Sequence, residues 1–188
     1  SLLSENPLAL SQLITLITVS RGINSWIGQH PVILDELLDP ISSYKVESKE
    51  EIEIELARKV SAANPDDLEV VMDLLREFRQ GYTLRLAAAD IARIISQTDV
   101  SGVLSDLAES ILAQSLAASA TSRQFEPDTV GAHKMGVVAY GKLGSRELGY
   151  NSDLDLIFLF EPAIGLDETV LYRHYSRLLQ RLIHILTT

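Results

Sequence analysis

The feature that most constrains the fold of this chain is a change in hydrophobic periodicity near Ser122. Before that point, apolar residues recur every three to four positions, which is the spacing of amphipathic helices. After it come two short apolar runs, Met135–Tyr140 and Leu154–Phe160, each bounded by glycine or proline. Such runs are typical of strands. The pattern predicts an α+β fold, mostly α, in which a helical bundle in residues 1–124 precedes a small mixed sheet with helices in residues 125–188.

Caps and chain breakers place the expected helices. Ser48 with Glu51 three residues later is a capping-box pattern, and Asn64 before Pro65 is a candidate N-cap. The stretch Leu84–Ile95 is apolar nearly all round, so we expect it at the buried centre of the bundle. We expect helices over residues 10–27 and 31–38, after Ser48, after Asn64, from near Asp99 or Ser101, and from Asp167 onward.

Composition restricts the partners and the compartment. Hydrophobic residues make up 46 % of the 188 residues, which is enough for a sizeable core. A formal net charge of −10 argues against non-specific nucleic-acid binding and against an anionic membrane surface, because both need a basic face. The chain has no cysteine, and it lacks a signal-peptide pattern and any apolar run of ~18–20 residues. We therefore expect a soluble protein that suits the reducing cytoplasm.

A glycine-rich turn with Gly141, Gly144 and Ser145 lies between the two apolar runs. Glycines allow positive φ and a close approach of the backbone to a ligand, and amides in such a turn can bind phosphate. We expect Gly144 and Ser145 to grip a triphosphate. Lys142 and Arg146 are further candidates for phosphate contact, although either can equally be a solvated turn charge.

An acidic pair, Asp153 and Asp155, stands at the entrance of the second run. The strand period of two puts both carboxylates on one face and Leu154 towards the core. Two carboxylates about 7 Å apart at their Cα atoms suit Mg²⁺, which prefers oxygen ligands from protein, phosphate and water. The spacing favours in-line attack on the α-phosphate of a nucleoside triphosphate, with both aspartates as metal ligands and catalytic residues. The four histidines show no metal-ligand spacing, and we expect them to be ordinary helix residues.

Residues 141–158 resemble the signature of the glutamine synthetase adenylyltransferases (glutamate–ammonia-ligase adenylyltransferases), a family of the DNA polymerase β-like nucleotidyltransferase superfamily. The matching segment reads GKLGSRELGYNSDLDLIF, and the helical part is similar at residues 20–22, 30–40 and 85–91. The resemblance implies a bacterial enzyme that transfers AMP from ATP to a tyrosine of glutamine synthetase with Mg²⁺. The family enzyme has two such halves, of which one attaches AMP and the other removes it by phosphorolysis. Leu148–Asp155 is more similar to the attaching, C-terminal half, and the regulators implied are glutamine and the PII signalling protein.

The chain departs from the family pattern in two respects. The family often has Gly-Gly where this chain has Gly144-Ser145. The superfamily also uses a third carboxylate on a later strand, and nothing after Phe160 offers one in a strand pattern. We therefore expect an incomplete nucleotidyltransferase core, a fragment of a longer protein, that is inactive or feeble by itself. Two alternatives stay open: a PII uridylyltransferase, which shares the glycine-rich turn, and a helical interaction module with an inactive nucleotidyltransferase remnant.

Overall fold

The computed structural model describes four ranges of the chain and a few isolated residues. The ranges are 44–64, 67–120, 135–161 and 168–187, and the isolated residues are Pro7, Leu10, Ser11, Ile14 and Thr18. The expected helices over residues 10–27 and 31–38 fall almost wholly outside these ranges. The expected domain boundary at residues 124/125 lies outside them as well, and it stays a prediction.

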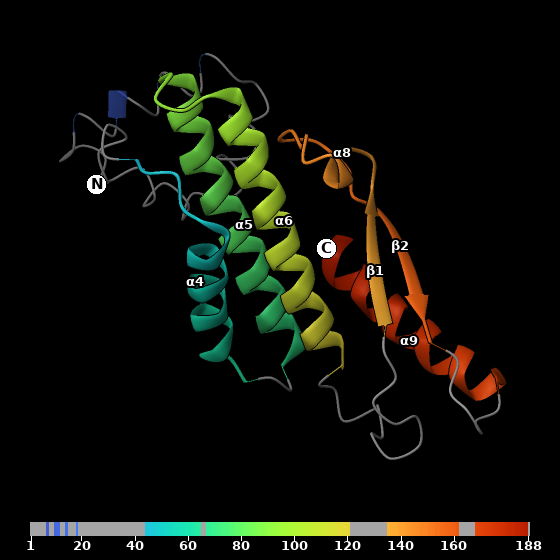
Figure 1. Cartoon of the computed structure of the whole chain (residues 1–188). Helices are drawn as coiled ribbons and strands as arrows, with labels where there is room; N and C mark the ends of the chain where they lie inside the picture. Colours follow the sequence, from blue (N-terminus) through green and yellow to red (C-terminus); the bar gives the residue numbers. More distant parts are fainter. Residues whose placement is uncertain are drawn as a thin grey trace.

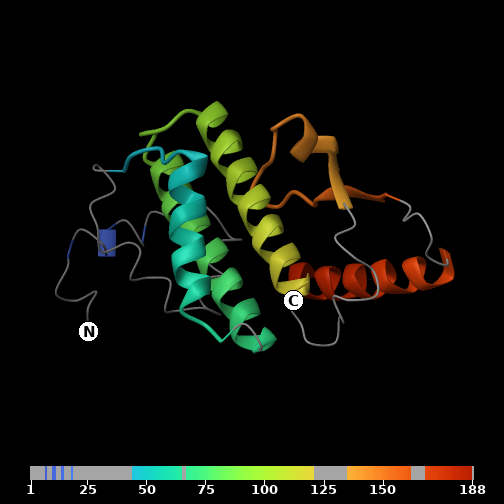
Figure 2. The same ribbon diagram turned by 60° about the horizontal axis from the view of Figure 1, so that its bottom comes forward.

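Four long helices make up most of the described structure, as predicted for a mostly α fold. They are α4 (Lys49–Ser61), α5 (Leu68–Ile91), α6 (Gln97–Ala120) and α9 (Glu168–Thr187). Helices α4, α5 and α6 pack side by side, and α6 also contacts α9 (Figure 1). Figure 2 shows α6 between the α4–α5 pair on one side and the strands with α9 on the other. Helix α6 is therefore the element that joins the two parts of the molecule.

The core follows the helical periodicity of the sequence. Ile52 and Leu56 of α4 are fully buried, one helical turn apart. They belong to one apolar cluster with residues of α5 and α6, among them Phe78, Tyr82 and Leu107. The predicted buried centre at 84–95 is confirmed only in part. Residues 86–89 are buried, but α5 ends at Ile91 and the following segment turns out to solvent, which leaves Ile94 41 % exposed.

Two of the predicted helix starts are shifted by capping interactions. Helix α5 is capped by Asp67, whose side chain accepts a hydrogen bond from the Val70 amide at 3.2 Å, so Asn64 is not its N-cap. Helix α6 begins at Gln97, because Ser96 and Asp99 hydrogen-bond reciprocally through their amides and side chains. Aspartate takes the place that glutamate or glutamine usually fills in this motif. The capping box of Ser48 and Glu51 at α4 is confirmed.

Two antiparallel strands, β1 (Met135–Tyr140) and β2 (Asp155–Phe160), form the described sheet. The bounds of β1 are those predicted, whereas β2 starts one residue later than expected. Pairing begins at Tyr140↔Asp155, because the chain leaves the ladder at Gly141 to form the short helix α8 (Gly141–Gly144). Phe160 stacks on Tyr175 of α9 with ring centroids 4.7 Å apart. Among the helices that the structure describes, none combines the length and the hydropathy that a membrane span requires.

Candidate functional site

The glycine-rich turn is a one-turn helix with a left-handed end. Helix α8 follows β1 directly and is closed by hydrogen bonds from the Arg146 amide to the Leu143 carbonyl and from the Glu147 amide to the Lys142 carbonyl. This bond pair is the Schellman motif, whose left-handed residue is usually glycine. Arg146 occupies that position with φ 58°. The Ser145 amide binds the Gly141 carbonyl, so the amides of residues 145–147 are all engaged within the turn.

Two glycines of the turn are required by close packing. Gly141 has φ +54°, and a Cβ added there would overlap Oδ2 of Asp155. A Cβ added at Gly144 would lie 2.7 Å from the Ala139 carbonyl oxygen of β1. The glycines thus let α8 fold back against β1, and they bring the backbone of Gly141 against the carboxylate of Asp155.

The acidic pair lies on the solvent side of the chain. Exposure alternates along this segment, with Asp153 and Asp155 exposed and Leu154 half-buried against the apolar core. Ile157 and Leu159 continue the exposed face of β2. The structure therefore brings Asp155 together with the turn at Gly141. Asp153 lies two residues before Asp155, outside β2, and is exposed as well.

The remaining turn residues predicted to contact phosphate are exposed. The Ser145 hydroxyl donates a hydrogen bond to Glu147 Oε2 at 3.0 Å. It also lies 3.4 Å from the Lys142 carbonyl oxygen. Lys142 and Gly144 are exposed beside it. These positions are accessible to a ligand, and their roles in binding stay predictions.

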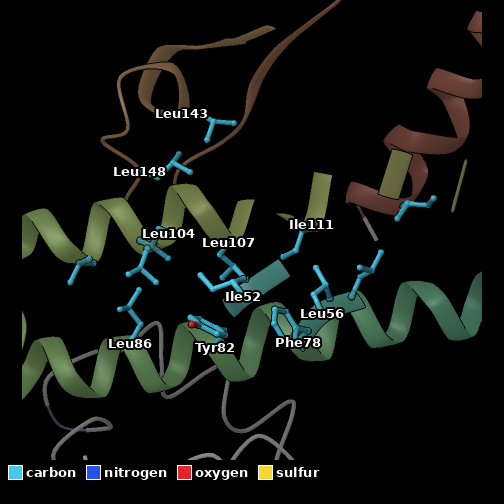
Figure 3. Packing of buried hydrophobic residues seen from close by; sticks show 14 of the residues in the cluster. Ile52, Leu56, Phe78, Tyr82, Leu86, Leu104, Leu107, Ile111, Leu143 and Leu148 are labelled. Atoms are coloured by element: carbon cyan, nitrogen blue, oxygen red, sulfur yellow. The ribbon is translucent and has the colours of Figure 1, made fainter. Parts of the chain in front are cut away.

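Apolar residues fix this turn onto the helices. Leu143 and Leu148 are 2 % and 4 % exposed and belong to the same core cluster as residues of α4, α5 and α6. Figure 3 shows both side chains on the side of α6 that faces away from α5, near the end of α6 that carries Leu104. This contact was not predicted from the sequence. The signal available for it was the spacing of five between two leucines that flank an otherwise polar turn.

Two polar contacts, also missed, join the site to the helices. Arg146 pairs with Asp106 of α6 at 2.7 Å and with Glu109 at 3.4 Å. The hydrogen bond that Arg146 donates to Asp106 raises the pKa of Arg146. The Tyr150 hydroxyl donates to Asp90 of α5 at 3.0 Å, and burial together with this bond raises the pKa of Tyr150. Arg146 is therefore engaged with carboxylates of the helical part.

No group of three or more acidic or histidine side chains that could hold a metal ion is found in the described ranges. Of the histidines, His174 lies edge-on to Tyr175 with ring centroids 5.4 Å apart, and His184 is exposed on α9. His30 and His133 lie outside the described residues. The role of Asp153 and Asp155 as metal ligands therefore stays a prediction.

Comparison with known proteins identifies the family. The sequence model of glutamate-ammonia ligase adenylyltransferase matches residues 10–188. This match covers the helices, the turn and the acidic pair together. The chain belongs to the glutamate-ammonia ligase adenylyltransferase family.

Relatives within this family are similar along the whole chain. It is 41 % identical to the bifunctional glutamine synthetase adenylyltransferase/adenylyl-removing enzyme of Nitrosococcus oceani, 40 % to that of Methylococcus capsulatus and 37 % to that of Vibrio parahaemolyticus. Each alignment covers 100 % of this chain and 21 % of the relative. The chain thus spans about a fifth of the length of these adenylyltransferases, and the family resemblance inferred from the turn and the acidic pair is confirmed.

Proposed function

We propose that this chain carries part of the catalytic centre of an adenylyltransferase that moves AMP from ATP to a tyrosine of glutamine synthetase. The observation that carries the proposal is the contact between Gly141 and Asp155. A turn suited to phosphate and a carboxylate suited to a metal meet there, and the absence of a side chain at Gly141 leaves room for the carboxylate. The family match and the names of the relatives support adenylyl transfer as the reaction.

The residues have distinct roles in this proposal. Asp153 and Asp155 hold Mg²⁺, which when bound stabilises charge on the phosphates and on the attacking oxygen. Ser145, through its hydroxyl, and Lys142, through its charge, orient the triphosphate together with the backbone at Gly144. The tyrosine hydroxyl releases its proton to solvent as its oxygen forms a bond to the α-phosphorus, and the bond from the α-phosphorus to the bridging oxygen of the β-phosphate breaks, which releases pyrophosphate. In-line positioning and electrostatic stabilisation supply most of the rate enhancement in such transfers.

Several finer assignments belong to the same proposal. We assign the chain to the half that attaches AMP, because Leu148–Asp155 is similar to that half. A third carboxylate from outside the described residues completes the metal site, so the chain alone is inactive or feeble. PII and glutamine act as regulators, and the enzyme works in the cytoplasm, which suits a chain without cysteine.

The decisive experiment replaces each aspartate by asparagine in the full-length protein. Asp153→Asn and Asp155→Asn each keep the shape of the side chain but remove its charge. We expect either to lower the rate of AMP transfer to glutamine synthetase at least about a thousandfold, which corresponds to ~4 kcal/mol of activation free energy. Asp73→Asn is the matched control, since Asp73 lies exposed on α5, where it pairs with Arg76 three residues further along the same helix. A loss of tenfold or less at Asp153 would contradict the metal role.

The two alternatives are separated by different observations. The family match favours adenylyl transfer over uridylyl transfer to PII. An interaction module would retain glutamine synthetase in a pull-down assay while the full-length protein shows no ATP turnover. Under the proposed function, transfer of labelled AMP accompanies binding.

A further inference from the structure

An ionic network connects the glycine-rich turn with two helices. Arg146 Nη2 lies 2.7 Å from Asp106 Oδ1, and Arg146 Nη1 lies 3.4 Å from Glu109 Oε1, both on α6. The other carboxylate oxygen of Glu109 lies 2.5 Å from Lys49 Nζ of α4. Arg146 Nη2 is also 3.4 Å from the Gly102 carbonyl oxygen, one turn earlier on α6. The guanidinium group therefore holds the end of α8 to one face of α6.

The backbone of Arg146 has a conformation that glycine adopts more readily than arginine. It adopts φ 58° at the left-handed end of the Schellman motif, where glycine is free of the steric cost that any other residue incurs. Arg93 has the same conformation, φ 57°, after α5, and closes it with the same pair of hydrogen bonds. No ion pair of Arg93 is found among the residues that the structure describes. The two arginines thus share a backbone geometry and differ in what their side chains contact.

We infer that Arg146 is a positioning residue, which holds the turn and through it Asp155 in the geometry for AMP transfer. This inference rests on the proposed function. The chain of contacts is short: Arg146 is bonded through its amide to Leu143 of α8, and the first residue of α8, Gly141, packs on the Asp155 carboxylate. A shift of the turn against α6 therefore moves the residues that bind phosphate relative to the metal ligand.

The ion pairs of Arg146 position the turn more than they stabilise the fold. The side chain of Arg146 is 48 % exposed, and those of Asp106 and Glu109 are 17 % and 32 % exposed. Pairs as open to solvent as these contribute little to folding, because solvent screens the charges. Small displacements in a catalytic centre, in contrast, change rates strongly. Removing the side chain of Arg146 should therefore lower the rate of AMP transfer strongly and change the free energy of unfolding little.

The test compares Arg146→Gly, Asp106→Asn and their combination in the full-length protein, with Arg93→Gly as the matched control. Glycine suits the left-handed backbone at both arginine positions, so only the side-chain contacts differ. We expect Arg146→Gly and Asp106→Asn each to lower kcat for AMP transfer about tenfold to a hundredfold. The double variant should lose no more than the worse single variant, because both break the same contact. Arg93→Gly should stay within about twofold of the wild type, and all thermal midpoints should agree within about 3 °C.

Three results would overturn the inference. Full activity of Asp106→Asn with a raised KM for ATP in Arg146→Gly would make Arg146 a phosphate ligand. Equal losses of activity in Arg93→Gly and Arg146→Gly would mean that the backbone conformation matters and the side-chain contacts do not. A thermal midpoint of Arg146→Gly low enough to account for its lost activity would mean that the ion pair with Asp106 serves stability.

Asp153→Asn, measured alongside, keeps the two proposals apart. If Asp153→Asn is inactive and Arg146→Gly is fully active, the positioning role alone fails, whereas an active Asp153→Asn removes the metal role.

Discussion

At the scale of single residues, the site depends on Gly141, because the carboxylate of Asp155 fills the space that a side chain at this position would need. Gly141 adopts φ +54° and its Cα faces the carboxylate of Asp155. Any other residue would have the steric cost of a left-handed backbone and would displace that carboxylate. The position of the Asp155 carboxylate relative to the turn therefore depends on the missing side chain at Gly141.

Replacing Gly141 by alanine should damage the site with little damage to the fold. We expect Gly141→Ala to lower AMP transfer by the full-length protein at least about a hundredfold, because the added methyl group moves Asp155. Gly136→Ala is the control, since a Cβ at Gly136 of β1 meets nothing within 4 Å. Transfer by the control should stay within about twofold of the wild type. Similar losses in both variants would mean that the sheet, and not the contact at Asp155, is sensitive.

At the scale of elements, the starts of α4, α5 and α6 are set by side chains that bind the first amides of each helix. The Ser48 hydroxyl accepts a hydrogen bond from the Glu51 amide, and the Glu51 carboxylate accepts one from the Ser48 amide at 2.7 Å. This second bond lowers the pKa of Glu51 below its ordinary value of 4.5. A lowered pKa means that the cap favours folding above pH 4.5, and that this contribution is lost as the pH falls through the pKa of the folded state.

Ser48→Ala should therefore weaken α4 at its first turn. We expect a decrease of about 1 kcal/mol in the free energy of unfolding of the chain at pH 7, measured by urea titration. Acidification should destabilise both proteins, because the variant keeps the amide of residue 48 and a protonated Glu51 accepts less strongly from that amide. Ser61→Ala at the other end of α4 is the control, since the Ser61 hydroxyl binds only the Arg58 carbonyl within the same exposed turn. A larger effect at Ser61 than at Ser48 would contradict the capping role.

At the scale of the whole molecule, the turn and the helical layer share one core. Leu143 and Leu148 pack in the cluster that contains Ile52, Phe78 and Leu107. Helix α6 contacts α4 and α5 on one side and α9 on the other. The turn between the strands is thus built onto the helices.

Shortening Leu143 should consequently destabilise more than the turn. We expect Leu143→Ala to lower the free energy of unfolding of the chain by about 2–5 kcal/mol, since the side chain is 2 % exposed. Leu159→Ala is the matched control, because Leu159 is 55 % exposed on β2 and its loss should cost within about 0.5 kcal/mol. Urea titrations of both variants followed by circular dichroism would measure the difference. Equal costs would argue that the turn does not belong to the shared core.

The sequence by itself determined features that depend on near neighbours. The bounds of β1, the cap at Ser48 and the buried stripe of α9 follow from periodicity and from contacts three or four residues apart. The acidic pair and the glycine-rich turn were likewise found from one short segment. Asn64 was predicted as the N-cap of α5 and this prediction was wrong, because the Val70 amide donates its hydrogen bond to the Asp67 side chain instead.

Only the tertiary structure decided which distant residues support the site. Arg146 and Asp106 are 40 residues apart, and Tyr150 and Asp90 are 60 apart. No spacing in one sequence relates such positions, because their proximity depends on how α5, α6 and the turn pack. For the same reason Arg146 was predicted as a phosphate contact or a solvated charge, whereas it pairs with α6. The residue type determines which interactions a side chain can make, whereas the packing of the helices and the turn determines which partner lies within reach.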